Sequence, residues 1–442
     1  FPWVCIKAQR LLSPLTNQAS RFLAENCPPT TVRRVLESDD DYDAELWGKI
    51  VEMGWTAAVI PEELGGLGLS YLELCVIAEE LGRACAPVPF SSSVYLATEA
   101  LLMAGSQAQK EAWLPRLAAG DAIGTFAFAE GPGETTAKSL TTRASGDKLS
   151  GTKVPVPDAG IASLAVVLAA HDGGDGAALY LVDTAQDAVS VSAVPTFDPT
   201  RGHGSLVLDG AAAEPLGKPG EGWSLTQKLF DRAAVPFAWE QVGGAQAALE
   251  QAREYALGRY AFGRPIASYQ AIKHKLANMY VKNTLARSNC YFGAWALNTD
   301  AAELPVAAAT ARVSATQAYY FASKENIQTH GGMGYTWEFD CQFFYRRAKL
   351  LSVAIGSERQ WQNKLISAVE LPVAAATARV SATQAYYFAS KENIQTHGGM
   401  GYTWEFDCQF FYRRAKLLSV AIGSERQWQN KLISAVEHSN AA

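Results

Sequence analysis

The spacing of hydrophobic residues gives the first part of the chain a helical pattern, from residue 1 to about 122. A capping box at Ser70–Glu73 precedes apolar residues that recur every three or four positions over Leu74–Leu81. Gly82 and Pro87 then predict the end of this helix. We therefore expect a helical N-terminal domain.

From about residue 123 to 215 the pattern changes to short β-type runs separated by glycine and aspartate turns. Ser163–Ala169 and Ala178–Val182 flank such a turn and predict a hairpin. Val189–Ala193 alternates apolar residues with serines, which is typical of a half-buried strand. This part of the chain is expected to form a small β domain.

A helical period returns after Gly217, where apolar residues mark one face over Ile272–Cys290. Helices, then strands, then helices again are typical of an α+β fold in which the two kinds of element are segregated. We expect an N-terminal helical domain (1–122), a central β domain (123–215) and a C-terminal helical bundle (216–369).

The chain also contains an internal copy. Glu303–Val369 recurs residue for residue as Glu370–Val436, a unit of 67 residues. A recent duplication explains this identity better than a functional array, because a solenoid needs at least three units. Each copy reads as two helices joined by a glycine turn. Because protein interiors are close-packed, only one copy can fill a given place in a bundle, and the other must pack elsewhere, swap between chains or stay loose.

Composition excludes several classes of protein. The 442 residues carry 38 Lys and Arg against 44 Asp and Glu, a net charge of −6, and no basic block that would bind nucleic acid. The longest apolar run, residues 161–170, is too short for a membrane span. The seven cysteines show no C-x-x-C pair, which predicts reduced thiols and a cytoplasmic location. The six histidines form no ligand cluster, so no metal site is expected.

Several motifs follow one another in a fixed order over residues ~40 to 369. As a set they resemble the acyl-CoA dehydrogenase family, and Arg259–Ile266 is similar to its most specific signature. The motifs are Ile60–Gly68, Glu79–Arg83, Leu216–Trp223 with Phe230-Asp231, Arg259–Ile266 with Gln270, and Gln328–Gly334.

The resemblance implies an FAD enzyme of fatty acid metabolism that oxidises an acyl-CoA thioester between its α and β carbons. A carboxylate must abstract the α-proton while flavin N5 accepts the β-hydride. The family further implies an electron-transferring flavoprotein as acceptor and an oligomer, usually of four chains.

The resemblance also implies cofactor contacts. Arg259 would bind the FAD pyrophosphate, because its planar guanidinium can form paired hydrogen bonds, and the glycines would let backbone N–H groups approach the cofactor across a subunit interface. The alternative is that Arg259 is a solvated helix charge and the glycines merely end a helix. The implied cofactor residues are Arg259, Phe262, Gln270, Gln328, Gly331 and Gly332.

Both usual positions of the catalytic base lack a carboxylate. The family carries its base in a Tyr-Glu-Gly-Thr run after Arg-Asp-Ala-Lys, and that position is Ile355 here and Ile422 in the second copy. Some members place the base two residues after the aspartate that matches Asp231, and that position is Ala233. Neither side chain can take a proton.

Glu240 is the nearest carboxylate on the same predicted helix. It lies seven residues after Ala233, about two turns or 10 Å along the helix. In an apolar pocket Glu240 could serve as the base; the alternative is a structural ion pair in the bundle. Asp231 is interpreted either as a substrate-side residue or as a helix cap.

The central β domain also departs from the family. Glu130–Thr136 differs from the family's Glu-Pro-Gly-Ala-Gly-Ser-Asp loop, and Pro155–Pro157 replaces a flavin-facing Trp-Ile-Thr run. Proline removes backbone donors there.

Three hypotheses of function remain. The chain is an active dehydrogenase that uses Glu240 or another base, or it is a catalytically silent, half-site subunit that completes the FAD site of an active paralogue. A third interpretation is a binding or regulatory member with no redox role, since fold does not fix function.

Overall fold

The computed structural model describes residues 2–171, 176–368, 371–397, 407–421 and 424–439. These residues fall into two compact units, one that ends at Trp361 and one that begins at Gln362. Each unit is described by itself below.

The N-terminal part of the first unit is helical, as the hydrophobic period predicts. The capping box at the start of α4 is confirmed. The Ser70 side chain accepts a hydrogen bond from the backbone of the first turn, and the Glu73 side chain accepts one from the Ser70 backbone N–H. Helix α3 begins with a second cap, in which the Leu46 N–H donates to Asp43 (2.9 Å). The helices are α1 (Pro2–Asn26), α2 (Pro29–Glu37), α3 (Ala44–Glu52), α4 (Tyr71–Arg83), the π-helical η2 (Ser91–Thr98), α5 (Glu99–Ala104) and α6 (Gln107–Ala118).

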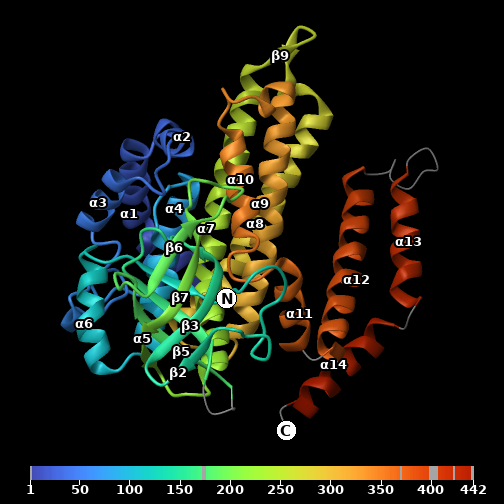
Figure 1. Cartoon of the computed structure of the whole chain (residues 1–442). Coiled ribbons are helices and arrows are strands. Elements are labelled where there is room, and N and C mark those ends of the chain that lie inside the picture. The colour runs from blue at the N-terminus through green and yellow to red at the C-terminus, as the bar shows by residue number, and fades with distance from the viewer. Residues whose placement is uncertain (1, 172–175, 369–370, 398–406, 422–423, 440–442) are drawn as a thin grey trace. The chain divides into compact units, whose positions relative to one another are not determined.

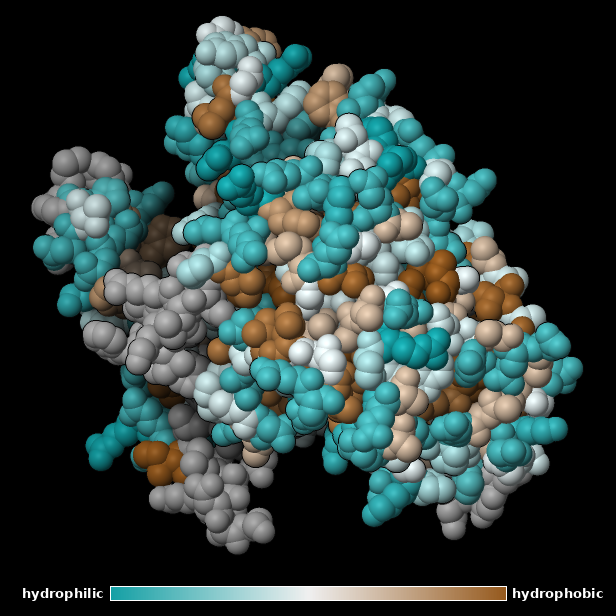
Figure 2. All heavy atoms as spheres, turned by 90° about the vertical axis from the view of Figure 1, so that its left-hand side faces the viewer, coloured by the Kyte–Doolittle hydropathy of each residue, from teal (hydrophilic) through white to brown (hydrophobic). Residues whose placement is uncertain are grey.

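On the face of the molecule that these helices form, hydrophilic side chains predominate and hydrophobic ones occur in small separated groups (Figure 2). No helix within the described residues is long and apolar enough to cross a membrane.

The central sheet has the order β6-β7-β3-β2-β4-β5-β8, and β1 pairs with β4 in parallel. The predicted hairpin is confirmed, because β4 and β5 pair antiparallel from Leu164↔Asp183 to Ala170↔Ala177. The strands are β1 (Gly124–Ala127), β2 (Arg143–Ser145), β3 (Lys148–Pro157), β4 (Leu164–Ala170), β5 (Ala177–Asp183), β6 (Val189–Ala193), β7 (His203–Ala212) and β8 (Glu214–Leu216).

The half-buried pattern expected for Val189–Ala193 is wrong. Strand β6 is the outer strand of this path and pairs with β7. Val191 is 38 % exposed, and only Val189 packs against the core of the domain. The alternation is present in the sequence, but both faces of the strand are exposed beyond Val189.

The C-terminal bundle is built on three long helices, which lie side by side in Figure 1. Its elements are α7 (Gly222–Gly258), β9 (Tyr260–Ala261), β10 (Arg264–Pro265), α8 (Gln270–Asn298), α9 (Leu304–His330), the short 3-10 turn η4 (Gly331–Tyr335) and α10 (Cys341–Leu351). Helix α11 (Glu358–Ala368) begins in the first unit and continues into the second.

Two glycines let helix α4 approach α7 closely. A Cβ on Gly82 would lie 1.9 Å from the backbone oxygen of Glu240, and one on Gly243 would lie 1.9 Å from that of Glu79. Helix α4 continues through Gly82 to Arg83. The helix thus ends between Gly82 and Pro87, as predicted, and Gly82 also allows contact between two backbones.

The second unit contains the internal copy. After the end of α11 it comprises α12 (Leu371–Thr396), α13 (Cys408–Val420) and α14 (Glu425–Ser439). Each copy thus forms three helices rather than the expected two, since the segment after the glycine turn divides into α10 and α11 in the first copy. The second glycine turn, residues 398–401, lies outside the described residues.

Candidate functional site

The ends of α7 and α9 meet at one end of the bundle. The Asn326 side chain donates to Gln251 (2.6 Å), and the His330 ring stacks on Tyr255 with centroids 4.1 Å apart. Lys275, near the start of α8, pairs with Glu325 of α9 (3.0 Å). The first turns of α8 therefore lie at the same end as the last turns of α7 and α9.

The six predicted cofactor residues gather at this end, which we call the bundle end. Arg259 directly follows α7, Gln270 begins α8, and Gln328 lies in the last turn of α9. Gly331 and Gly332 come next, at the start of η4. Phe262 is at the tip of the β9–β10 hairpin, which projects from the bundle in Figure 1.

The bundle end faces solvent. Phe262 is 96 % exposed, and the side chains of Arg259 and Gln328 are exposed too. A Cβ added at Gly331 or Gly332 would meet nothing within 4 Å. These residues form an open surface in this chain and do not enclose a cofactor.

The hairpin that carries Phe262 is held in place by bonds near its base. The Ile266 N–H donates to the Arg259 carbonyl (2.8 Å), and the Arg264 guanidinium lies over the Tyr269 ring at 4.1 Å. These contacts fix the base of the hairpin, whose tip presents the exposed Phe262 ring.

The loop after the glycine turn is tied to the N-terminal domain. Arg33 of α2 donates to the Trp337 carbonyl (2.5 Å) and forms an ion pair with Asp340, and the Trp337 ring N–H donates to Glu37 (2.5 Å). Sequence reasoning missed these residues, because they are about 300 positions apart and belong to no shared motif.

Asp231 lies away from the bundle end. It is buried, and its neighbour Phe230 packs edge-on against Phe126 and Phe128 at the β1 strand (5.8 and 5.1 Å). Helix α7 begins at Gly222, well before Asp231. The interpretation of Asp231 as a helix cap is therefore wrong, and the substrate-side role stays a prediction.

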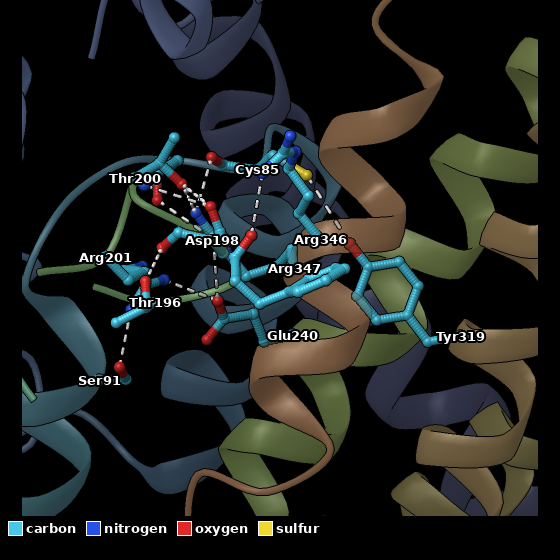
Figure 3. A network of polar contacts seen from close by, with 12 residues as sticks. Cys85, Ser91, Thr196, Asp198, Thr200, Arg201, Glu240, Tyr319, Arg346 and Arg347 are labelled. Atoms are coloured by element: carbon cyan, nitrogen blue, oxygen red, sulfur yellow. Dashed lines mark hydrogen bonds and ion pairs between the residues drawn. The ribbon is translucent and has the colours of Figure 1, made fainter. Parts of the chain in front are cut away.

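Glu240 is 1 % exposed and lies between two arginines. Its Oε1 accepts a hydrogen bond from Arg201 (2.7 Å) and is 3.5 Å from the Arg347 guanidinium. Figure 3 shows these side chains turned toward one another from different parts of the fold. This geometry matches the structural ion pair that sequence reasoning left open.

Arg347 joins Glu240 to a second buried carboxylate, since its Nε donates to Asp198 (2.6 Å). Burial disfavours the charge of Arg347, but Asp198 and Glu240 outweigh it and raise its pKa above the usual value. Burial likewise opposes the charge of Asp198, and Arg347 lowers its pKa. Asp198, Arg201, Glu240 and Arg347 therefore form a charge-balanced group, here called the buried charge cluster.

Sequence profiles of known families match most of the chain. The profile "Acyl-CoA dehydrogenase, N-terminal domain" matches residues 13–121, and "Acyl-CoA dehydrogenase, C-terminal domain" matches residues 220–370 and again 359–435. The chain belongs to the acyl-CoA dehydrogenase family.

Relatives of known name agree with this assignment. Acyl-CoA dehydrogenase IpdE2 of Mycobacterium tuberculosis is 33% identical over 359 residues, 80% of this chain and 96% of that protein. Butyryl-CoA dehydrogenase from Megasphaera elsdenii has a similar structure, with TM-score 0.74, 25% identity, and coverage of 80% of this chain and 97% of that one. A chain of the ChsE4-ChsE5 complex from Mycobacterium tuberculosis has TM-score 0.73 and 28% identity, over 80% of this chain and 95% of its own.

Members of the acyl-CoA dehydrogenase family are flavoprotein oxidoreductases that act on acyl-CoA in fatty acid metabolism. The family assignment, the segregated α+β fold and the order of the domains follow the motifs recognised in the sequence. Roles of single residues do not follow from membership.

The positions where family members carry their base are apolar and buried in this chain. Ile355 is 2 % exposed and Ala233 is 1 % exposed. Ile422 lies outside the described residues. Arg347 occupies the aspartate position of the family's Arg-Asp-Ala-Lys run, so the charge there is reversed, and Asp198 and Glu240 balance it.

The residues at the family's flavin-facing run fit FAD poorly. Pro155–Pro157 offers neither a hydroxyl nor an aromatic ring, and the Pro157 carbonyl already accepts a hydrogen bond from Thr125 (2.5 Å). The next residue, Asp158, is buried and accepts a hydrogen bond from Ser92 (2.5 Å). At this run the β domain offers no hydroxyl or aromatic ring to a flavin, whereas the exposed arginine and glycines of the bundle end fit a diphosphate that reaches them from outside.

The loop before this run is fastened by a buried ion pair. Lys153 is fully buried and donates to Glu130 (2.7 Å), which also accepts from the backbone N–H groups of Thr141 and Thr142 (2.6 and 3.0 Å). Burial opposes the charge of Glu130, but the bonds from Lys153 and Thr141 outweigh it and lower the pKa of that carboxyl to about 2.

Proposed function

We propose that this chain is the half-site subunit of an FAD-dependent acyl-CoA dehydrogenase. In this proposal a homologous active chain binds most of the flavin and supplies the catalytic base, and the bundle end of this chain completes the FAD site. The reaction is α,β-dehydrogenation of an acyl-CoA thioester. One observation carries the proposal: the predicted cofactor residues are gathered and solvent-exposed, whereas both base positions are Ile355 and Ala233.

The chemistry needs a carboxylate within hydrogen-bonding reach of the α-carbon. Oε1 of Glu240 is engaged by Arg201 and lies beside Arg347. Abstraction of a proton by this group would leave Asp198 as the one charged carboxylate of the cluster beside two buried guanidiniums, which is costly in a protein interior. This supports assigning the base to a partner chain.

At the bundle end Arg259 would bind the diphosphate, and Phe262 and Gln270 would lie against the adenine half. Gln328, Gly331 and Gly332 would offer backbone and amide donors. FAD supplies the hydride acceptor when bound. The residues of this chain bind and orient it, and none of them moves a proton in the reaction.

A hetero-oligomer is part of the proposal. A structurally similar chain is part of the ChsE4-ChsE5 complex, which is a complex of two differently named chains. On this chain an apolar strip of α8, with Tyr280, Val281 and Leu285 all more than half exposed, is suited to a subunit contact. We propose an assembly of four chains, with electron-transferring flavoprotein as its electron acceptor.

A second candidate is an active dehydrogenase that uses its own Glu240. One observation favours it, since Oε2 of Glu240 has no hydrogen-bond partner among the described residues. That oxygen would be the one to take the proton.

Flavin content separates the two candidates. The chain is purified alone and after co-expression with a homologous chain that carries the Tyr-Glu-Gly-Thr base, and flavin per polypeptide is measured by visible absorbance. We expect no flavin on the chain alone and one flavin per pair of unlike chains. One flavin per chain, reduced by acyl-CoA in the chain alone, would establish the second candidate and reject the first.

The variant Arg259→Gln tests the role of the bundle end. It should lower the affinity of the mixed assembly for FAD by about tenfold or more, because a charge-assisted bond to a diphosphate is lost. Arg253→Gln is the control, since Arg253 is also exposed on α7 and lies 3.9 Å from Glu254 in a weak ion pair. Equal flavin affinity in both variants would contradict the assignment.

A further inference from the structure

Helix α12 of the internal copy repeats the sequence of α9, whose inner face packs in the bundle. In α9, Ala315 and Ala318 are buried (0 % and 2 % exposed). Their counterparts in α12, Ala382 and Ala385, are exposed. A helix face with small apolar side chains allows close packing against another helix.

The two copies share several side-chain contacts. Arginine, glutamine and lysine side chains make corresponding contacts 67 positions apart, so these parts of the repeat have the same local structure in both copies. The pairs are Arg312 with the Leu351 carbonyl and Arg379 with the Leu418 carbonyl; Gln317 with Glu358 (2.7 Å) and Gln384 with Glu425 (2.6 Å); and Lys349 over Tyr320 (4.0 Å) and Lys416 over Tyr387 (4.3 Å).

Helix α7 recognises this face by specific contacts. The ring of Tyr319 lies where Gly244 has no side chain, and a Cβ there would come within 2.4 Å of it. Asn326 donates to Gln251 (2.6 Å). A helix that docks here must therefore present a tyrosine and an asparagine seven residues apart.

The second copy meets this requirement, because Tyr386 and Asn393 have the same spacing and the same neighbours in sequence. We propose that α12 and α13 are a second occupant of the place that α9 and α10 take on α7 and α8. The chain then exchanges between two bundles, each completed by one copy of the repeat. The partner that fits the exposed face of α12 is the α7–α8 surface of the same chain.

The lengths of the connections set the balance between the two bundles. The first copy follows α8 after five residues (299–303), whereas the second would follow after residues 299–370. Loop closure becomes less favourable as the 3/2 power of length, so the first copy is favoured roughly 50-fold. The second copy becomes the main occupant only when docking of the first is weakened by more than that factor.

The substitution Tyr319→Ala supplies such a weakening. Removal of a large buried aromatic side chain lowers the equilibrium constant for docking by more than about 100-fold. The full chain should therefore shift to the second copy and lose only a few degrees in melting temperature. Tyr386→Ala is the matched control and should leave the melting temperature unchanged. The double variant should melt well below either one, and a Tyr319→Ala chain that melts as low as the double variant would overturn the proposal.

Disulfide trapping identifies the docked copy directly. Cysteine at Gln251 is combined with cysteine at both Asn326 and Asn393, and linked peptides are mapped by mass spectrometry after mild oxidation. We expect a 251–326 link in the otherwise unchanged chain and a 251–393 link within one chain when Tyr319→Ala is added. No 251–393 link, or one that joins two chains, would reject exchange within the chain. Both measurements are independent of flavin and of activity.

Discussion

At the scale of single residues, buried charges in this protein are paired with identifiable partners. Glu130 is held by Lys153 and by two backbone N–H groups, and this ties the loop over residues 130–142 to strand β3. The pKa of Glu130 is lowered to about 2 in the folded chain. A lowered carboxylate pKa means that the folded state binds this proton less readily than the unfolded state does.

Glu130 contributes stability above its unfolded pKa of about 4.3, and this is lost as the pH falls toward 2. In Glu130→Gln the free energy of unfolding should therefore fall less steeply between about pH 4.5 and 2 than in the unchanged chain. Urea unfolding at a series of pH values measures this slope.

Glu134→Gln is the control for this experiment, because Glu134 is an exposed carboxylate in the same loop. Its slope should match that of the unchanged chain. If Glu130→Gln has the same slope as Glu134→Gln, the bonds to Lys153 and Thr141 do not hold the carboxylate in its charged form.

At the scale of elements, the packing of α4 on α7 depends on the absence of side chains. The Gly82 and Gly243 contacts bring the two backbones so close that no Cβ fits between them. This contact brings the α7 segment around Glu240 against the N-terminal domain. The position of Glu240 in the buried charge cluster therefore depends partly on glycine at residues 82 and 243.

The substitution Gly82→Ala should destabilise the fold by about 3 kcal/mol or more, because either the helices must separate or a backbone must shift. Gly48→Ala is the matched control in helix α3, where an added Cβ meets nothing within 4 Å. That change should be neutral or stabilising by up to about 1 kcal/mol, since alanine favours helix over glycine. Thermal unfolding of the two variants gives the comparison, and similar melting temperatures would contradict the close-contact argument.

At the scale of the whole first unit, the buried charge cluster connects all three predicted domains. Asp198 and Arg201 come from the loop between β6 and β7, Glu240 from α7 and Arg347 from α10. Arg201 also donates to Ser91 of η2 (2.7 Å), in the N-terminal part. One group of charges thus fixes the relative position of the domains around it.

Glu240→Gln tests this structural role against catalysis. Removal of one charge from a buried group leaves two arginines facing Asp198 alone, which should cost about 3 kcal/mol of stability. The control Glu250→Gln, on the same helix, removes a partly exposed pair with Arg83 and should cost about 1 kcal/mol or less.

In a mixed assembly that is folded and saturated with FAD, Glu240→Gln should leave the rate of flavin reduction by acyl-CoA unchanged. Stopped-flow absorbance measures this rate. Loss of reduction together with normal stability would show that Glu240 is the base, contrary to the structural interpretation.

The sequence was most informative where a pattern is local. Hydrophobic period and capping predicted the helical domain, the hairpin of β4 and β5 and the order of the domains, because the side-chain period follows directly from backbone geometry. Ordered motifs were sufficient to recognise the family. The apolar residues Ile355 and Ala233 at the base positions were also readable from the motifs alone.

Local patterns failed where the outcome depends on what lies opposite. Gly82 indicates the end of α4, but no local pattern predicts its contact with α7. Val189–Ala193 reads as half-buried, but all of it except Val189 is exposed. Burial depends on the neighbouring layer, which a periodic pattern does not specify.

The sequence by itself therefore determined the family, the domain order, the lack of a carboxylate at both usual base positions and the identity of the two repeats. Only the tertiary structure decided that Glu240 meets Arg201 and Arg347, and that the cofactor residues share one open end of the bundle. The physical reason is distance along the chain. Motifs and periods are read over a few residues, whereas these contacts join residues that are tens to hundreds of positions apart and come together only when the layers pack.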